Sequence, residues 1–361
     1  MITKYSEIIK LLENIHPEKY AKDRNYVDGS VSRLSPYISR GVISTNEIFD
    51  YLVYMGYKFN SFQKFLQEMI WREFWQIKWQ ENNINEDFKK QKDVVHFGMP
   101  EIVYRSNTKI DVIDHSVEEL YRNGYIHNHL RMYLASFITN IAKYHWLAPA
   151  QWMYYYLLDA DWGSNALSWQ WVSGASRDKK YFANQSNINK FTYSKQQNTI
   201  LDISYDDLIN LNAEQLYSKS KKLELKTNFP KSDVFLNKPQ KPICIYNFYN
   251  LDVNWRQEID AHRILLIEPS VFRKYPVSNQ SINFMLDLSK NINGIKIFVG
   301  EFNELPINKS DVYFKEHPLN YNYIGKEDSR DWICRPTKKT SSFFKHWNYV
   351  IKGLKNNLKQ N

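Results

Sequence analysis

The hydrophobic pattern of this chain changes near Lys241, and that change limits the folds open to it. Up to about residue 200, apolar residues recur at helical spacing. In residues 61–80 this stripe consists of Phe62, Phe65, Leu66, Met69, Ile70 and Ile77. After Lys241, short β-branched or aromatic runs bounded by Pro, Gly and Asn alternate with a helical pattern at 281–292. Such alternation predicts a small α/β module with parallel strands.

The same pattern predicts the organisation of the chain. We expect a mainly α protein, with an all-helical domain at 1–200, a polar connector at 201–240 and a small α/β module at 241–361. A length of 361 residues also favours more than one core. The helical pattern continues from about Ser116 to Trp146 with few breakers. DWGSN, at 161–165, indicates a break followed by a capped helix with Ser164 or Asn165 near its start.

Composition excludes several classes of protein. Cys244 and Cys334 are the only cysteines, which rules out a disulfide framework and an all-cysteine iron–sulfur cluster in one chain. No run of eighteen apolar residues occurs, and the first twenty residues lack the apolar core of a signal peptide. We expect a cytoplasmic protein without a membrane span, monomeric by default.

The positive charge is concentrated in a basic C-terminal tail. The net charge is +9, and from Arg335 onward the chain has one Arg, six Lys and no acidic residue. A tail of this kind is more often a solvated helix face than a contact with a polyanion. Charge alone therefore does not establish DNA binding.

A second face of the predicted helix at 61–80 presents charged and aromatic side chains that could bind a ligand. Spacings of three and four place five residues on it: Glu68, Trp71, Arg72, Trp75 and Trp79. A carboxylate beside large aromatic rings suits a pocket for a flat ligand that forms hydrogen bonds. The alternative is domain packing with a Glu68–Arg72 surface pair.

The next segment, GYIHNHLRMYLASF, places Asn128, Arg131, Met132 and Ala135 on one helix face. A buried Arg131 would need a carboxylate, and DADWGSNALSWQW (159–171) supplies Asp159 and Asp161 as candidates. His127 and His129 are two residues apart and cannot converge on one ion from a helix, so we predict no metal site.

Two further stretches have more than one interpretation. Trp169 and Trp171 diverge by roughly 200° on a helix, so one ring can face a pocket while the other packs or relays an electron. In DGSVSRLSPYISRG (28–41), the residues Ser30, Ser32, Arg33 and Ser35 could cradle a pyrophosphate. Serine-rich helix starts are common, so this second signal is weak.

Four motifs together resemble one family. SRLSPYISRG, EMIWREFW, GYIHNHLRMYLASF and DADWGSNALSWQW follow the order and approximate spacing of the flavin-binding domain of the photolyase/cryptochrome family. The resemblance covers residues 20 to about 195. It implies an all-helical domain that holds FAD in a bent, U-shaped conformation.

The resemblance also implies roles for individual residues around FAD. The phosphates and ribityl chain would be held by Tyr20, Ser32, Arg33, Leu34 and Ser35. Arg72 would lie near the cofactor, and Arg131 would pair with Asp159 beside the isoalloxazine ring. Asp161 would meet the polar edge of the flavin, and Asn165 would face its N5 atom.

A substrate pocket and an electron relay are implied as well. The residues where cyclobutane-dimer photolyases contact a flipped pyrimidine dimer are matched by Glu68, Trp71, Asn128, Met132 and Trp171. Trp169 matches the flavin-proximal member of a tryptophan relay and Trp146 the middle one. No Trp occurs between Trp79 and Trp146, so the usual distal partner is absent or replaced; Tyr104 is one candidate substitute.

We therefore predict a deoxyribodipyrimidine photolyase-like lyase that binds damaged DNA and uses light and FAD to split cyclobutane pyrimidine dimers. Only about twenty residues precede Tyr20, so we expect the family's usual N-terminal antenna domain to be missing; the antenna chromophore, if any, is unknown. One alternative is a cryptochrome-like FAD photoreceptor that signals to a protein partner. Another is a flavoprotein that binds a different ligand, which His129 favours because many repair enzymes carry Arg there.

Overall fold

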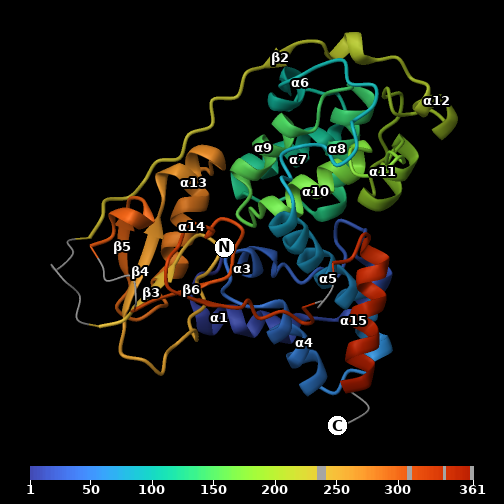
Figure 1. The fold of residues 1–361 in the computed structure, drawn as a ribbon. Helices are drawn as coiled ribbons and strands as arrows, with labels where there is room; N and C mark the ends of the chain where they lie inside the picture. The colour runs from blue at the N-terminus through green and yellow to red at the C-terminus, as the bar shows by residue number, and fades with distance from the viewer. Residues whose placement is uncertain (234–240, 307–310, 336–338, 358–361) are drawn as a thin grey trace.

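The protein is mostly helical, with a five-stranded parallel sheet in its C-terminal part, which confirms the predicted fold class. The computed structural model describes residues 1–233, 241–306, 311–335 and 339–357. Figure 1 shows the helices of the first half of the chain beside the sheet. No helix within the described ranges is long and apolar enough to cross a bilayer.

The helical part is organised around α5 (Phe59–Glu81), which packs against α2, α10 and α15. The elements that precede it are α1 (Tyr5–Ile9), η1 (Lys10–Asn14), α2 (Pro17–Asp23), α3 (Ser35–Ser39) and α4 (Thr45–Tyr54). Those that follow it are α6 (Glu101–Tyr104), α7 (Asp111–Asn123), α8 (Asn128–Ser136), η2 (Phe137–Ile141), α9 (Leu147–Tyr156), α10 (Trp162–Ser173) and α11 (Gln185–Thr192).

The apolar stripe of α5 forms core, as its spacing predicts. Its members from Phe62 to Ile70 are buried, whereas Ile77 is partly exposed. Trp79, expected on the chemical face, is buried against the α/β module instead, with its ring 5.9 Å from Tyr249 and 5.8 Å from Tyr275. For Trp79, domain packing is therefore the correct interpretation.

The helical period between Ser116 and Trp146 is interrupted in the structure. α7 ends at Asn123 and is capped by Gly124, whose φ of 64° is left-handed; a Cβ on Gly124 would lie 2.7 Å from Cγ of Leu158. α8 begins only at Asn128. The capped helix expected near 161–165 is α10, and its N-cap is Asp161, whose side chain accepts from the Ser164 backbone N–H.

The connector contains short elements. These are α12 (Tyr205–Ile209), η3 (Glu214–Tyr217) and β2 (Ser220–Lys221), which pairs antiparallel with β1 (Met99–Pro100). The chain then runs to the sheet edge (the yellow segment in Figure 1), where Asp233 N donates to Ile297 O at 2.9 Å. The rest of the predicted connector, 234–240, lies outside the described residues.

The C-terminal sheet has the order β5-β4-β3-β6-β7, and every pairing is parallel. Its strands are β3 (Ile243–Tyr246), β4 (His262–Ile267), β5 (Lys296–Val299), β6 (Val312–Lys315) and β7 (Lys326–Asp328). The connections carry α13 (Pro269–Lys274), α14 (Asn279–Ser289) and η4 (Phe302–Glu304). The sequence pattern predicts the first four strands but misses β7, whose residues KED are short and polar.

The two faces of the sheet pack differently. Cys244 and Tyr246 of β3 belong to the core shared with the helical part, while Ile243 and Ile245 point to a separate cluster on the other face. The last helix, α15 (Phe343–Asn357), leaves the sheet and lies against α5 (Figure 1). This return brings residues from the end of the chain to the helical part.

Candidate functional site

A cavity of about 760 Å³ is lined by residues from α2, α5, α8, α9 and α10. Its volume falls within the range of about 300–1,000 Å³ that is usual for ligand and cofactor sites. The structure brings most of the predicted site residues to its wall: Tyr20, Ser35, Glu68, Trp71, Arg72, Asn128, Arg131, Met132, Asp159, Asp161, Asn165, Trp169 and Trp171.

Four predicted residues do not line this cavity. Leu34 and Trp146 are fully buried. Ser32 Oγ accepts from the Leu34 backbone N–H at 3.4 Å. Arg33 has a left-handed φ of 53°, and its guanidinium carbon lies 5.9 Å from the ring centre of Tyr125, which does line the cavity. Arg33 therefore contacts a residue of the cavity wall but does not line the cavity itself.

Arg131 and Asp159 form an ion pair in the cavity wall. Asp159 Oδ2 accepts from Arg131 Nη2 at 2.9 Å and from Ser35 Oγ at 2.7 Å, while Oδ1 has no partner in the described chain. Burial alone would raise the pKa of Asp159, but the charge and hydrogen bond of Arg131 outweigh it and lower that pKa. Asp159 is therefore ionised, with an acceptor atom free for a ligand that donates.

Asp161 is held by three donors. Oδ2 accepts from Arg72 Nη1 at 3.1 Å and from Gln76 Nε2 at 2.5 Å, and Oδ1 accepts from Ser164 N at 2.7 Å. The first two come from α5 and the third from the first turn of α10. This carboxylate is fixed in position because it joins two helices.

Asn165 and Trp169 extend the wall along α10. The amide Nδ2 of Asn165 donates to Ala150 O at 2.8 Å, which leaves its carbonyl oxygen and its second N–H for a ligand. Trp169 is buried. Trp146 donates from Nε1 to Asp87 Oδ1 at 2.6 Å and lies beside His145, with ring centres 5.8 Å apart.

Aromatic contacts continue from Trp146 toward the surface. His145 stacks on the exposed ring of Phe97 at 5.6 Å. The ring of Tyr104, named above as a candidate distal residue, lies 6.2 Å from that of Tyr121.

The residues predicted to contact a substrate line the same cavity. Glu68 pairs with Lys64 at 2.9 Å and lies 3.7 Å from Arg24. The Trp71 ring is stacked on Phe343 of α15, with centres 3.4 Å apart and planes 5° apart. The guanidinium carbon of Arg177 lies over the Trp171 ring, 3.5 Å from its centre. The chain itself thus covers one face of Trp171 and one face of Trp71, whose ring also lies 4.7 Å from the Trp75 ring.

Sequence reasoning missed several of these contributors. Tyr125 lies inside a quoted motif, and its ring stands 5.9 Å from Arg33 and 5.7 Å from Arg131. An aromatic residue in the same motif as Arg131 could have been considered as a partner of that cation. No pattern in the sequence pairs Phe343 with Trp71, or Arg177 with Trp171.

His129 lines the cavity and is buried. Its Nδ1 lies 2.8 Å from Asn25 O, and burial lowers the pKa of the imidazole. His129 is therefore neutral at physiological pH and brings a polar but uncharged group to this wall.

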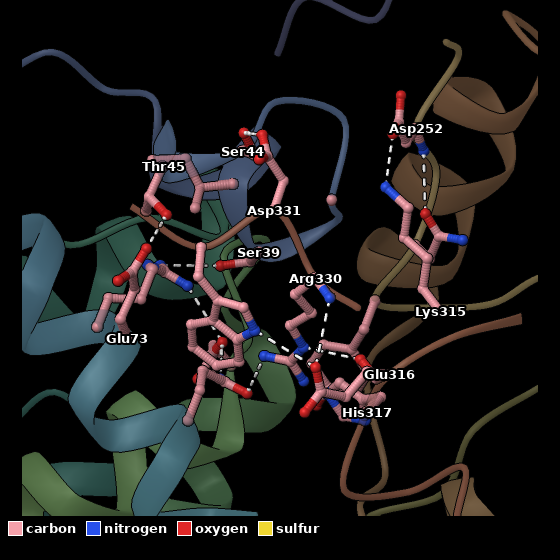
Figure 2. Close-up of a pocket in the computed structure, with 18 of the residues that line it drawn as sticks. Ser39, Ser44, Thr45, Glu73, Asp252, Lys315, Glu316, His317, Arg330 and Asp331 are labelled. Carbon is pink, nitrogen blue, oxygen red and sulfur yellow. Dashed lines mark hydrogen bonds and ion pairs between the residues drawn. The ribbon is translucent and has the colours of Figure 1, made fainter. Parts of the chain in front are cut away.

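A second cavity, of about 240 Å³, lies between α5, residues 38–47 and the carboxyl ends of β3 and β6 (Figure 2). Arg72 and Asp161 line both cavities. Around the second one, Lys315 pairs with Asp252 at 2.6 Å, and Thr45 donates to Glu73 at 2.6 Å. Residues of the α/β module thus line a cavity that Asp161 also borders.

Comparison with known proteins identifies the helical part. Residues 59–202 match the model of the FAD binding domain of DNA photolyase. A deoxyribodipyrimidine photo-lyase of Vibrio cholerae is 29% identical over 184 residues, which is 47% of this chain and 38% of that protein. The protein of the same name from Alkalihalophilus pseudofirmus is 28% identical over 159 residues, which is 41% of this chain and 32% of the relative.

A crystal structure of a bacterial class III photolyase from Agrobacterium tumefaciens is also similar, with a TM-score of 0.45 and 24% identity. The match covers 52% of this chain and 42% of that chain. The matched part spans less than half the length of each of these relatives.

The chain contains an FAD-binding domain of the photolyase/cryptochrome family. That domain implies FAD as the cofactor. The cavity fits such a group: it combines cations at Arg72 and Arg131 with an unpartnered carboxylate oxygen on Asp159. These are the charges and acceptors that phosphates and ring N–H groups need.

Proposed function

We propose that this protein binds FAD in the larger cavity and uses light to split cyclobutane pyrimidine dimers in damaged DNA. One observation carries the proposal. Glu68, Trp71, Asn128, Met132 and Trp171 line the same cavity as the Arg131–Asp159 and Arg72–Asp161 pairs. A flipped lesion and a flavin could therefore meet within one cavity. The names of the relatives, deoxyribodipyrimidine photo-lyases, support this reaction class.

The residues proposed to bind the cofactor would act by fixing the positions of two carboxylates. Arg131 and Ser35 hold Asp159, while Arg72 and Gln76 hold Asp161. Both carboxylates would accept hydrogen bonds from the flavin ring. The Asn165 amide is anchored on Ala150 O and has no acidic proton to give, which suits a reduced flavin that remains anionic. When bound and reduced, FAD would supply the light-excited electron that opens the dimer.

The substrate residues would compensate for the stacking that a flipped dimer loses. Stacking on an aromatic ring is worth about 1–3 kcal/mol per base. Trp71 and Trp171 offer such rings, each supported on one face by Phe343 or Arg177. Glu68 and Asn128 could then hydrogen-bond the base edges. Because a damaged base stacks poorly, extrusion of the lesion costs less than extrusion of a normal base.

The position of α15 supports this arrangement. Successive residues turn about 100° around a helix, so Glu68 and Trp75 lie on one side of Trp71 and Phe74 on the other. Glu68 and Trp75 line the cavity, whereas Phe74 lies 5.8 Å from Phe343. Phe343 therefore approaches Trp71 from the side turned away from the cavity. It would hold the indole in place from behind.

The test is illumination of the purified protein with an oligonucleotide that carries one cyclobutane dimer, once with the flavin oxidised and once with it reduced beforehand. Recovery of intact pyrimidines in light, and not in darkness, is the expected result. Flavin photoreduction without repair would instead support a photoreceptor. Bound flavin with neither response would support a flavoprotein that acts on another ligand.

A further inference from the structure

The α/β module reaches the larger cavity through one row of hydrogen bonds. After β7 the chain returns to α5, where Arg330 Nη1 donates to Gln76 Oε1 at 2.7 Å. Gln76 Nε2 in turn donates to Asp161 Oδ2 at 2.5 Å. Asp161 lines the larger cavity. Arg330 is thus two hydrogen bonds from a carboxylate of the proposed flavin site.

Arg330 is itself held firmly by the module. Its Nε donates to Glu316 O at 2.8 Å, and its backbone N donates to Glu316 Oε2 at 3.3 Å (Figure 2). Burial lowers the pKa of the guanidinium to about 10, so it remains charged at neutral pH. Glu316 follows directly after β6, so the position of this cation depends on the sheet.

The guanidinium of Arg330 helps to decide which way the Gln76 amide points. A guanidinium has donors only, so the amide oxygen of Gln76 must face it. The amide nitrogen then faces Asp161, where it donates. Turned the other way, the amide oxygen would meet the carboxylate, and two acceptors would face each other without a proton between them. The Asp161 carboxylate only accepts and favours the same orientation, so Arg330 and Asp161 fix the Gln76 amide from its two ends.

We propose that Arg330 is a positioning residue for the flavin site, acting through Gln76 to hold Asp161 toward the polar edge of the flavin. The inference rests on the proposed function, because Asp161 would meet that edge. It gives the C-terminal module a role in setting the affinity and reduction potential of the cofactor. Loss of this buried cation should make the bound flavin harder to reduce, since reduction adds negative charge nearby.

The test replaces Arg330 and compares the bound flavin. Arg330→Met keeps an unbranched apolar stem but removes the side-chain donors, and Glu316 retains hydrogen bonds from Gln80, Trp332 and Arg335. We expect flavin to dissociate about ten-fold more readily, the size of one hydrogen bond to a charged group, with a lower reduction potential and an altered visible spectrum. Arg330→Lys, which can still donate to Gln76, should restore most of these properties.

A matched control separates orientation from general damage. Arg335 pairs with the same Glu316 at 2.8 Å but is largely exposed. Arg335→Met should leave the flavin spectrum and potential unchanged. Equal changes in Arg335→Met and Arg330→Met would overturn the proposal, as would an unchanged flavin in Arg330→Met.

A double-mutant cycle keeps the proposal falsifiable if Arg330→Met is unstable. Gln76→Met should reproduce the loss of flavin affinity, and adding Arg330→Met to it should cost nothing more. Fully additive losses of flavin affinity would contradict the proposal that Arg330 acts through Gln76. If the unmodified protein binds no flavin, the proposed function itself fails; if it binds flavin and is insensitive at Arg330, only the present inference fails.

Discussion

The guanidinium of Arg131 lies 2.9 Å from Asp159 Oδ2, and the other oxygen of that carboxylate has no partner in the described chain. Asp159 is almost fully buried. Removing one member of a buried ion pair leaves an uncompensated charge, which typically costs about 3–5 kcal/mol. The pair therefore links the stability of the fold to the proposed flavin site.

Arg131→Ala should lose both flavin and about 3–5 kcal/mol of unfolding free energy. Denaturant unfolding and the ratio of flavin to protein measure the two effects. Arg122→Ala is the control, because Arg122 forms an exposed pair with Glu119 at 2.9 Å and should change stability by no more than about 1 kcal/mol. Unchanged flavin occupancy in Arg131→Ala would contradict the role assigned to the pair.

Glu68→Ala should reduce dimer repair by about 10–100-fold and leave bound flavin intact, because its proposed partner is the lesion. The readouts are the repair rate under light and the absorption of the purified protein. Glu81→Ala removes another carboxylate of α5, paired with Lys78 at 2.7 Å, and should have no effect on repair. Loss of flavin from Glu68→Ala would refute the assignment.

Phe343→Leu should weaken binding of dimer-containing DNA by about five-fold, the size of one aromatic pair. Leucine keeps the apolar contact but not the flat face that stacks on Trp71. Binding measured by fluorescence anisotropy should be unaffected by Phe344→Leu, since that side chain is 66% exposed. Tighter binding in Phe343→Leu would show that Phe343 blocks the pocket instead of supporting it.

Glu73→Gln should stabilise the protein at high pH. Burial raises the pKa of Glu73 to about 7, above the ordinary value of 4.5. The wild-type protein therefore loses stability as pH rises from about 4.5 to 7, by at most about 1.4 kcal/mol per unit and roughly 3 kcal/mol in total. The variant does not titrate there, so its advantage should grow between pH 5 and pH 8 in denaturant unfolding. An advantage independent of pH would exclude this explanation.

Part of the fold was readable from local pattern. The stripe from Phe62 to Ile70 predicts α5, and the short apolar runs predict β3 to β6 as parallel strands. β7 was not predicted because its three polar residues carry no strand signal. It forms a strand by pairing with β6. Gly124 ends α7 inside an apparently continuous period because the turn needs a left-handed φ.

Part of the candidate site was readable in the same way. A buried Arg131 demands a carboxylate, and two acidic residues stood in the next motif, so the pairing with Asp159 could be expected. Phe343 against Trp71 and Arg330 against Gln76 could not. Their roles at the site remain proposals, but the contacts themselves are features of the fold.

The sequence by itself determined the family motifs, the helical period and the chemistry of the residues that line the cavity. Only the tertiary structure decided which face of each indole is supported and which way the Gln76 amide points. The physical reason is that periodicity reports the face a residue occupies within its own element. Contacts between distant segments depend on how whole elements pack, and a single local pattern does not contain that information.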